Sequence, residues 1–528
     1  MRVTATLDER AREFCAKLAA DGFASRMLSG DASLWGPAAE SEASIRLGWT
    51  ALGPELDDTI ARARALHEEL TTDGRTNVVL CGMGGSSLAP EVICAAAGRP
   101  LVTLDSSDPD QVRAALDTEL ARLTVVVSSK SGSTIETASQ RATFEKAFTD
   151  AGLDPARHIV VVTDPGSPLQ KSAEAAGYQV FTADPNVGGR FSALTAFGMV
   201  PSILAGVDVT DLVADARAGL SALAADTPDN PALVLGAAVA ADPSRNKLLV
   251  SVGDGLANLP DWVEQLVAES TGKDGHGVLP VIGHPSLPDP ATTDFADAVH
   301  VGLSGGSGDP DTPVTVSGSL GTQFVVWEAA TAVIGRILGV NPFDQPDVES
   351  AKVAARSALD ATASPEEPAL RLDGMDVYAD ASLLGSASDL DGALAALLGR
   401  LGPTSFLAVM AYLQRTDDSP LPAVATGLIE RCGRPVTFGW GPRFLHSTGQ
   451  LHKGGAPEGV FLQITGAPAG PDLPIPGTDL SFGRLILAQA SGDGAVLSGH
   501  GLPVMRVHLH DRSTGIAAVV SALGRAGS

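Results

Sequence analysis

A doubly wound α/β fold, in which parallel sheets are covered by helices on both faces, is predicted for this chain of 528 residues. Short runs of β-branched and aliphatic residues alternate with helical segments of ordinary length. Hydrophobic residues make up 44% of the chain, whereas aromatic residues make up only 4%. Loops rich in Gly and Ser follow several of the strands, and ligands of such folds bind beyond the carboxyl ends of the strands.

The N-terminal part, residues 1–70, is predicted to be helical because Leu7–Leu18 and Glu55–Leu70 show amphipathic spacing. A first α/β unit, residues 71–228, follows it. The strands expected in this unit are Asn77–Cys81, Leu101–Asp105, Thr124–Ser128 and His158–Thr163. The residues from Glu136 to Phe148 have helical composition.

Two further α/β units are expected, at residues 229–360 and 370–528, after joints near Thr227–Pro231 and Ala361–Leu370. In the second unit we expect strands at Lys247–Val252, Val278–Ile282 and Ala298–Gly302, and helices at Leu259–Glu269 and Thr322–Leu338. In the third unit we expect strands at Ser405–Leu413, Val460–Thr465 and Val504–Leu509, and helices at Ala387–Leu401, Leu421–Cys432 and Leu480–Leu487.

The net charge of −26 argues against nucleic acid and anionic membranes as partners, because the field of the protein repels polyanions. The four cysteines include no CxxC pair, so neither a disulfide framework nor a zinc site is expected. No signal peptide is recognised at the N-terminus, and no apolar run reaches the roughly 20 residues of a membrane span. A cytoplasmic location is therefore expected.

The most informative segment runs from Val125 to Thr137, where a buried strand leads into five hydroxyl side chains, Lys130 and Gly132. Hydroxyls and backbone N–H groups delivered to the N-terminus of a helix form a phosphate site. The alternative is a Ser-rich turn that only caps the helix. The loop Gly82–Leu88, with Gly85 and Ser86, follows the first strand and strengthens the first interpretation.

Three further segments each have an ordinary and a functional interpretation. Arg190 follows two glycines and is either an exposed Arg or a cation in a cleft. Glu269, at the end of an apolar helix, is either solvated or desolvated enough to act as a general base. The stretch Asn341–Lys352 contains a Pro-initiated helix on which Lys352 is either exposed or functional.

Together these segments resemble glucose-6-phosphate isomerases. The motifs GGS, SxSGxTxET-like, VGGR, ESxGK and FDQPxVExxK follow one another in family order over residues 75–355, which covers both sugar-isomerase (SIS) domains. The resemblance implies tandem SIS-type parallel sheets with an additional C-terminal α/β unit. Arg46–Trp49 and His446–Lys453 are similar to stretches in the isomerase half of fused transaldolase/glucose-6-phosphate isomerases.

The resemblance implies reversible isomerisation of glucose 6-phosphate and fructose 6-phosphate through a cis-enediolate, with neither cofactor nor metal. Glu269 matches the base, Arg190 the group that stabilises the oxyanion, and Lys352 a residue that assists ring opening. The residues that it implies for substrate binding are Gly85, Ser86, Ser129, Lys130, Ser131, Thr134 and Gln345.

The sequence departs from the family pattern at two points: at Asp347, near the start of the predicted helix, and at the histidine that opens the sugar ring. Asp347 stands where the family has Gly, and we expect it to add a carboxylate near the site. The ring-opening histidine of the family is not matched by any of the three histidines in the corresponding interval, His276, His284 and His300. We expect His452 of the C-terminal GQLH to replace it; the alternatives are His446, or Lys352 with spontaneous anomerisation.

Two functions of other classes fit these residues less well. A non-catalytic phosphosugar sensor does not need Glu269, Arg190 and Lys352, and a glutamine-dependent hexosamine synthase needs an N-terminal nucleophilic Cys, which Cys15 does not supply. Activity on mannose 6-phosphate stays open. Family resemblance implies a homodimer, and a functional link to transaldolase is left open.

Overall fold

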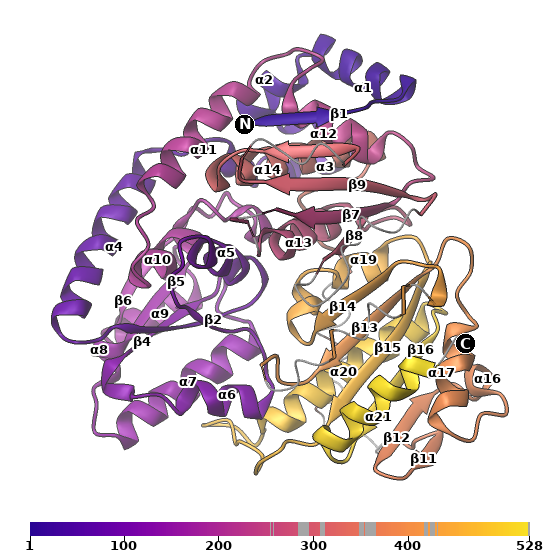
Figure 1. The fold of residues 1–528 in the computed structure, drawn as a ribbon. Helices are drawn as coiled ribbons and strands as arrows, with labels where there is room; N and C mark the ends of the chain where they lie inside the picture. Colours follow the sequence, from indigo (N-terminus) through magenta and orange to yellow (C-terminus); the bar gives the residue numbers. More distant parts are fainter. Residues whose placement is uncertain are drawn as a thin grey trace.

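Three mainly parallel sheets form the framework of the computed structural model (Figure 1). The structure describes residues 1–253, 255–256, 258–283, 295–306, 312–347, 353, 359, 366–416, 421–422, 428–429 and 431–525. Within these residues, no helix combines the length and the apolar character needed to cross a membrane.

The first sheet has the order β3-β2-β4-β5-β6, with every neighbouring pair parallel. Its strands are β2 (Asn77–Gly82), β3 (Val102–Leu104), β4 (Leu123–Ser128), β5 (Ile159–Thr163) and β6 (Gln179–Thr182). The helices around it are α4 (Pro54–Thr72), α5 (Leu88–Ala96), α6 (Pro109–Leu116), α7 (Ile135–Asp150), α8 (Pro155–His158), α9 (Pro168–Ala175) and α10 (Ala196–Leu204). The chain order reverses between β2 and β4, and such a switch point is where ligands bind in doubly wound sheets.

The second sheet has the order β1-β10-β9-β7-β8. Its strands are β7 (Lys247–Val252), β8 (Leu279–Ile282), β9 (Ala298–Ser304) and β10 (Val314–Ser317), which run parallel, and the antiparallel edge strand β1 (Arg2–Ala5). Its helices are α11 (Thr210–Leu223), α12 (Pro231–Ala240), α13 (Leu259–Thr271) and α14 (Leu320–Leu338). Before α4 the N-terminal part adds α1 (Glu9–Ala20), α2 (Phe23–Leu28) and α3 (Pro37–Ala43).

The third sheet has the order β11-β12-β16-β15-β13-β14 and lies at the lower right of Figure 1. Its strands are β11 (Leu370–Leu372), β12 (Met375–Ala379), β13 (Phe406–Tyr412), β14 (Val436–Trp440), β15 (Gly459–Gly466) and β16 (Val504–Leu509). Its helices are α16 (Ala381–Leu384), α17 (Leu390–Leu398), α19 (Gly449–Gly454), α20 (Phe482–Gly499) and α21 (Arg512–Arg525).

The predicted α/β class and the tandem arrangement of parallel sheets are confirmed, and every strand that we expected is present within two residues of its bounds. The N-terminal part is not wholly helical, because β1 pairs antiparallel with β10. Helix α20 continues past its predicted end at Leu487 as far as Gly499. Half of the helix expected at Leu421–Cys432 lies outside the described residues, and the divisions near residues 70, 228 and 370 stay a prediction.

The three units are held together by shared cores. One hydrophobic cluster joins the N-terminal helices to residues of both the first and the second sheet, such as Leu80 and Leu248. Leu249 of the second sheet packs in the core of the third unit, and Phe482 of α20 packs against the first sheet. The third unit therefore contacts both of the others.

Candidate active site

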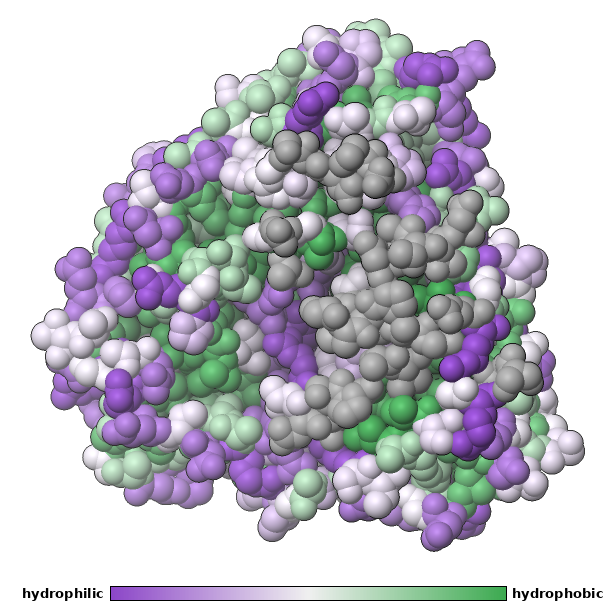
Figure 2. Space-filling view, viewed as in Figure 1, coloured by the Kyte–Doolittle hydropathy of each residue, from purple (hydrophilic) through white to green (hydrophobic). Residues whose placement is uncertain are grey.

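A cavity of about 560 Å³ lies beyond the carboxyl ends of β2 and β4, where the three units meet. Figure 2 shows hydrophilic side chains gathered in a hollow between the first and third units. The predicted site residues that line the cavity are Gly85, Ser86, Ser129, Lys130, Ser131, Thr134, Arg190, Glu269 and Gln345. Segments spread over more than two hundred residues of sequence thus converge on one space.

The loop after β4 forms one wall. The backbone N–H of Gly132 donates to Ser129 Oγ (3.1 Å), and Gly132 itself adopts a φ of +76°. Thr134 is the N-cap of α7 but makes no capping hydrogen bond with its side chain. The orphan N–H groups at the start of this helix, with its partial positive charge, therefore remain free of a side-chain cap and face the hydroxyl-rich loop.

Lys130 supplies a cation beside this loop. Its ammonium group lies 2.7 Å from a carboxylate oxygen of Asp164, which also lines the cavity. Arg46, from the segment before α4, is a further cation in the lining. Local positive charge is what an anion needs to enter a protein whose net charge is −26.

The loop after β2 forms the second wall through a short 3₁₀ turn, Gly84–Ser86. A Cβ atom on Gly85 would lie 1.9 Å from the carbonyl oxygen of Gly189, so glycine is required for the two loops to touch. The same contact places the next residue, Arg190, at the cavity. The loop Gly82–Leu88 thus allows the two backbones to approach closely.

Arg190 is buried and fixed by several acceptors. Its Nε donates to Ser270 Oγ (2.7 Å), and its Nη2 donates to the carbonyl oxygens of Pro342 (2.7 Å) and Asp344 (2.8 Å). Burial lowers the pKa of the guanidinium, although the charge of Glu269 acts in the opposite direction. The exposed-Arg interpretation is wrong, because the side chain is only 4% exposed.

Glu269 lies in the last turn of α13 and is buried. Its Oε1 is 3.7 Å from Nη1 of Arg190, and its Oε2 accepts a hydrogen bond from Gln265 (3.1 Å). Gln345 completes this side of the cavity, since its Oε1 accepts from Nη1 of Arg190 (3.4 Å). A carboxylate with one cation and one amide donor is held in a single orientation.

The third unit contributes His446, from the 3₁₀ turn Arg443–His446. Its Nε2 lies 3.2 Å from Oε1 of Glu136, in the first turn of α7, and Gln489 donates to the same oxygen (2.7 Å). Burial alone would raise the pKa of Glu136, but the hydrogen bond and charge of His446 lower it overall. The pair is therefore an imidazole oriented by a carboxylate.

The expectation for His452 is wrong. Its ring is 6% exposed and stacks among Phe406, Phe444 and Phe461, with no described hydrogen-bond partner for either nitrogen. Burial lowers the pKa of this imidazole to about 3. The alternative, His446, is the histidine that lines the cavity.

Asp347 does not line the cavity either. Its Oδ2 accepts a hydrogen bond from the side chain of Gln450 in α19 (2.6 Å), and its backbone N–H donates to the same amide (2.9 Å). The extra carboxylate thus ties the second unit to the third. Lys352 and His284 lie outside the described residues.

Sequence reasoning assigned no role to several residues of the lining, among them Arg46, Glu136, Gln265 and Gln489. Gln265 had a signal, because it precedes Glu269 by one helical turn and so faces the same way. Glu136 lies in the SxSGxTxET-like motif and Arg46 in the stretch Arg46–Trp49, but neither received a role of its own. Within the described residues, no group of three or more His, Cys, Asp or Glu side chains is arranged to hold a metal ion.

Tandem parallel sheets that meet at a hydroxyl-lined cavity define the class of α/β proteins with two SIS-type domains. A hypothetical protein from Thermus thermophilus has a similar structure (TM-score 0.54, 25% identity, 68% of this chain and 100% of that chain covered). So does a glucose-6-phosphate isomerase from Chlamydia trachomatis (TM-score 0.52, 18% identity, 67% and 87% covered), a likeness that concerns the fold.

The sequence model of the family described as phosphoglucose isomerase matches residues 50–278. A probable glucose-6-phosphate isomerase of Haloarcula marismortui is 30% identical over 347 residues, which cover 55% of this chain and 79% of the relative. The glucose-6-phosphate isomerase of Rubrobacter xylanophilus is 30% identical over 374 residues, with 57% and 86% covered. The chain belongs to the phosphoglucose isomerase family.

Proposed function

We propose that this chain interconverts glucose 6-phosphate and fructose 6-phosphate, with Glu269 as the general base. The observation that carries the proposal is the single cavity in which Glu269, Arg190 and the loop Ser129–Thr134 meet. Membership of the phosphoglucose isomerase family and the names of the relatives support the same reaction.

The phosphate group of the substrate binds at the N-terminus of α7. Lys130 and the hydroxyls of Ser129, Ser131 and Thr134 surround that position, and the helix end adds N–H donors that the Thr134 side chain leaves uncapped. Fixing the phosphate at this end leaves the reacting carbons to extend across the cavity toward Glu269. The binding energy of the phosphate then serves to orient the sugar.

Glu269 moves the proton that the isomerisation requires. Its carboxylate takes the proton from C2 of the open-chain aldose, and the C–H electron pair forms the C1–C2 double bond of a cis-enediolate while the C1 oxygen becomes negative. The acid returns the proton to C1, and the proton of the C2 hydroxyl passes to the C1 oxygen, which leaves the ketone at C2. Hydrogen is conserved within the substrate, so the balance needs no external oxidant or reductant.

Arg190 stabilises the enediolate. It is held by Ser270, Pro342 and Asp344 before any substrate arrives, so little reorganisation accompanies the appearance of negative charge. Its Nη1 lies 3.7 Å from Oε1 of Glu269, so the guanidinium is beside the place where the base and the reacting carbons meet.

His446 opens the sugar ring. Imidazole is a common general acid and base in enzymes, and the contact with Glu136 orients the ring of His446. Transfer of a proton to the ring oxygen and removal of one from the anomeric hydroxyl yield the open chain. Lys352 stays a predicted assistant in this step, because it lies outside the described residues.

The test is conversion of fructose 6-phosphate to glucose 6-phosphate, coupled to NADPH formation, in wild type and Glu269→Gln. Loss of a general base should reduce kcat about 10²–10⁴-fold. Glu264→Gln is the matched control, because Glu264 belongs to the same helix but does not line the cavity. Binding of fructose 6-phosphate without any wild-type turnover would instead support a phosphosugar sensor.

Substrate range and assembly stay predictions. Mannose 6-phosphate and glucose 6-phosphate share one enediolate, since they differ only at C2, so activity on both is compatible with the proposed chemistry. The homodimer and the functional link to a transaldolase rest on resemblance alone.

A further inference from the structure

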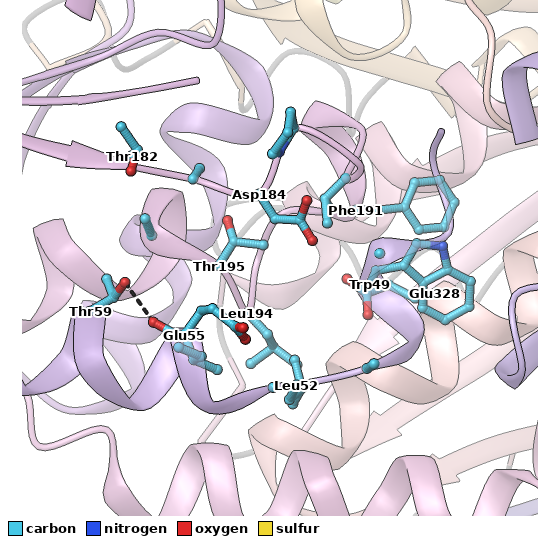
Figure 3. Close-up of a pocket in the computed structure, with 18 residues that line it drawn as sticks. Trp49, Leu52, Glu55, Thr59, Thr182, Asp184, Phe191, Leu194, Thr195 and Glu328 are labelled. Carbon is cyan, nitrogen blue, oxygen red and sulfur yellow. Dashed lines mark hydrogen bonds between the residues drawn. The ribbon is translucent and has the colours of Figure 1, made fainter. Parts of the chain in front are cut away.

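A second cavity, of about 470 Å³, is lined by Phe191, the residue that follows Arg190 of the active site (Figure 3). It is bounded by the 3₁₀ turn Gly48–Thr50, the start of α4, the end of β6, and helices α10 and α14. The two cavities share none of their described lining residues. The reaction described above makes no use of this space.

Two buried polar groups line this second cavity without a protein partner. Glu328, in the middle of α14, is 1% exposed, and its Oε1 has no hydrogen-bond partner among the described residues. Trp49 is 3% exposed, and its indole N–H is also unpartnered there. A buried polar atom left unpaired is destabilising, so both groups favour a partner inside the cavity.

Glu328 is suited to an uncharged partner. Burial raises the pKa of its carboxyl group well above the ordinary value, because the cavity wall around it favours the uncharged form. A protonated carboxyl group donates one hydrogen bond and accepts others, whereas the Trp49 indole only donates. A ligand with groups that both donate and accept satisfies the two together.

The mouth of the cavity excludes anions. Glu55 and Asp184 are exposed there, and no described lining residue is Lys, Arg or His. The nearest cations, Arg46 and Arg217, donate to backbone carbonyls of the lining and are paired with Glu42 and Asp57. A phosphate would therefore meet two exposed carboxylates and no unpaired cation among the described lining residues, which directs a sugar phosphate to the first cavity. Figure 3 shows Glu55 and Thr59 at one end of the cavity, and Trp49, Phe191 and Glu328 at the other.

We propose that this second cavity binds a small uncharged polyhydroxylated molecule, of the class of free sugars and polyols. Its hydroxyls accept from the Trp49 N–H, bond to Glu328, and donate to the carboxylates at the mouth. The aliphatic and aromatic part of the lining, including Leu56 and Leu194, covers the C–H faces. Because this inference concerns a separate cavity, it does not depend on the isomerase activity.

The test follows the indole N–H signals of ¹⁵N-labelled full-length protein during titration with D-glucose. Trp49→Phe assigns the Trp49 signal by its disappearance. Saturating fructose 6-phosphate is present throughout, so that the first cavity is filled. We expect a saturable shift of the Trp49 signal and none of Trp440, which belongs to β14 of the third unit.

Ala51→Phe provides the blocking variant, because Ala51 is exposed and lines the cavity. Ala61→Phe is its matched control, since Ala61 is exposed on α4 and does not line it. The shift should vanish in the first variant and persist in the second. An unmoved Trp49 signal, an unaffected shift in Ala51→Phe, or an equal response to glucose 6-phosphate would each overturn the proposal.

Discussion

Nε2 of His446 lies 3.2 Å from Oε1 of Glu136, although 310 residues separate the two in sequence. Glu136 starts α7 beside the loop of the first sheet, whereas His446 comes from the third unit. Both residues line the cavity that also contains Arg190. The third unit thus forms part of the cavity, and its loss would remove the imidazole from it.

The first prediction concerns this pair. His446→Gln should lower kcat/KM for fructose 6-phosphate about 10²–10⁴-fold, because the cyclic substrate then opens only spontaneously. Glu136→Gln should cause a smaller loss in the same direction, since the amide keeps a hydrogen bond but not the charge. Steady-state kinetics measure both effects.

The control for this prediction is His510→Gln. His510 also pairs with a carboxylate, that of Asp376 at 3.0 Å, but it is exposed and does not line the cavity. A wild-type value of kcat/KM in His446→Gln, or an equal loss in His510→Gln, would contradict a role of His446 in ring opening.

The central strands of the first sheet could be predicted because they are deeply buried and appear as unbroken apolar runs, such as β4, which is buried at every residue. Six strands were missed: β1, β6, β10, β11, β12 and β14. They are short strands at the edges of their sheets or next to an edge strand, and most of them are only partly buried. The end of α20 was missed because Gly492 and Gly494 suggest a break; Gly494 instead lies in the helix and packs close to Gln463, whose Oε1 would be 3.0 Å from a Cβ there.

The loops of the site could be predicted because each follows a strand directly, and parallel strands bring their carboxyl ends together. The choice between His446 and His452 could not be predicted from the sequence. Both belong to one segment, Arg443–Gly454, and only the packing of α19 turns His452 into an aromatic core. Glu136 lies in the SxSGxTxET-like motif but received no role of its own, because a Glu in the first turn of a helix is commonly explained by the helix dipole.

The second prediction concerns the contact of the two glycine loops. Gly85→Ala should reduce kcat about 10²-fold or more, because its Cβ would lie 1.9 Å from the carbonyl of Gly189 and force Arg190 to move. Gly189→Ala is the matched control, since a Cβ there meets nothing within 4 Å. Steady-state kinetics of both variants measure the effect. Equal kcat values would show that the close approach of the two glycine loops does not position Arg190.

The third prediction concerns acid stability at the junction of the units. Arg443 of the third unit lies 2.6 Å from Glu91 of α5 and also pairs with Asp105. Although burial raises the pKa of Glu91, Arg443 and Arg415 lower it to about 2. The depressed pKa contributes about 3 kcal/mol of stability that is fully present above pH 4.5 and lost as the pH falls to 2.

Urea unfolding between pH 7 and pH 3 measures this contribution. Wild type should be more stable than Glu91→Gln at pH 7, and the difference should shrink progressively below pH 4.5. Glu119→Gln serves as the control, because Glu119 forms an exposed pair with Arg122 at 3.9 Å that is worth little. A difference that does not change with pH would show that the ion pairs of Glu91 do not set its pKa.

The fourth prediction concerns how many chains one active site needs. A single chain supplies the loop Ser129–Thr134, Arg190, Glu269 and His446 to one cavity. Specific activity should therefore stay constant when the protein is diluted through the concentration at which any dimer dissociates, with light scattering reporting the mass. If specific activity instead falls in parallel with dissociation of the dimer, a second copy of the chain must contribute to the active site. The third unit of the same chain would then not be enough to complete that site.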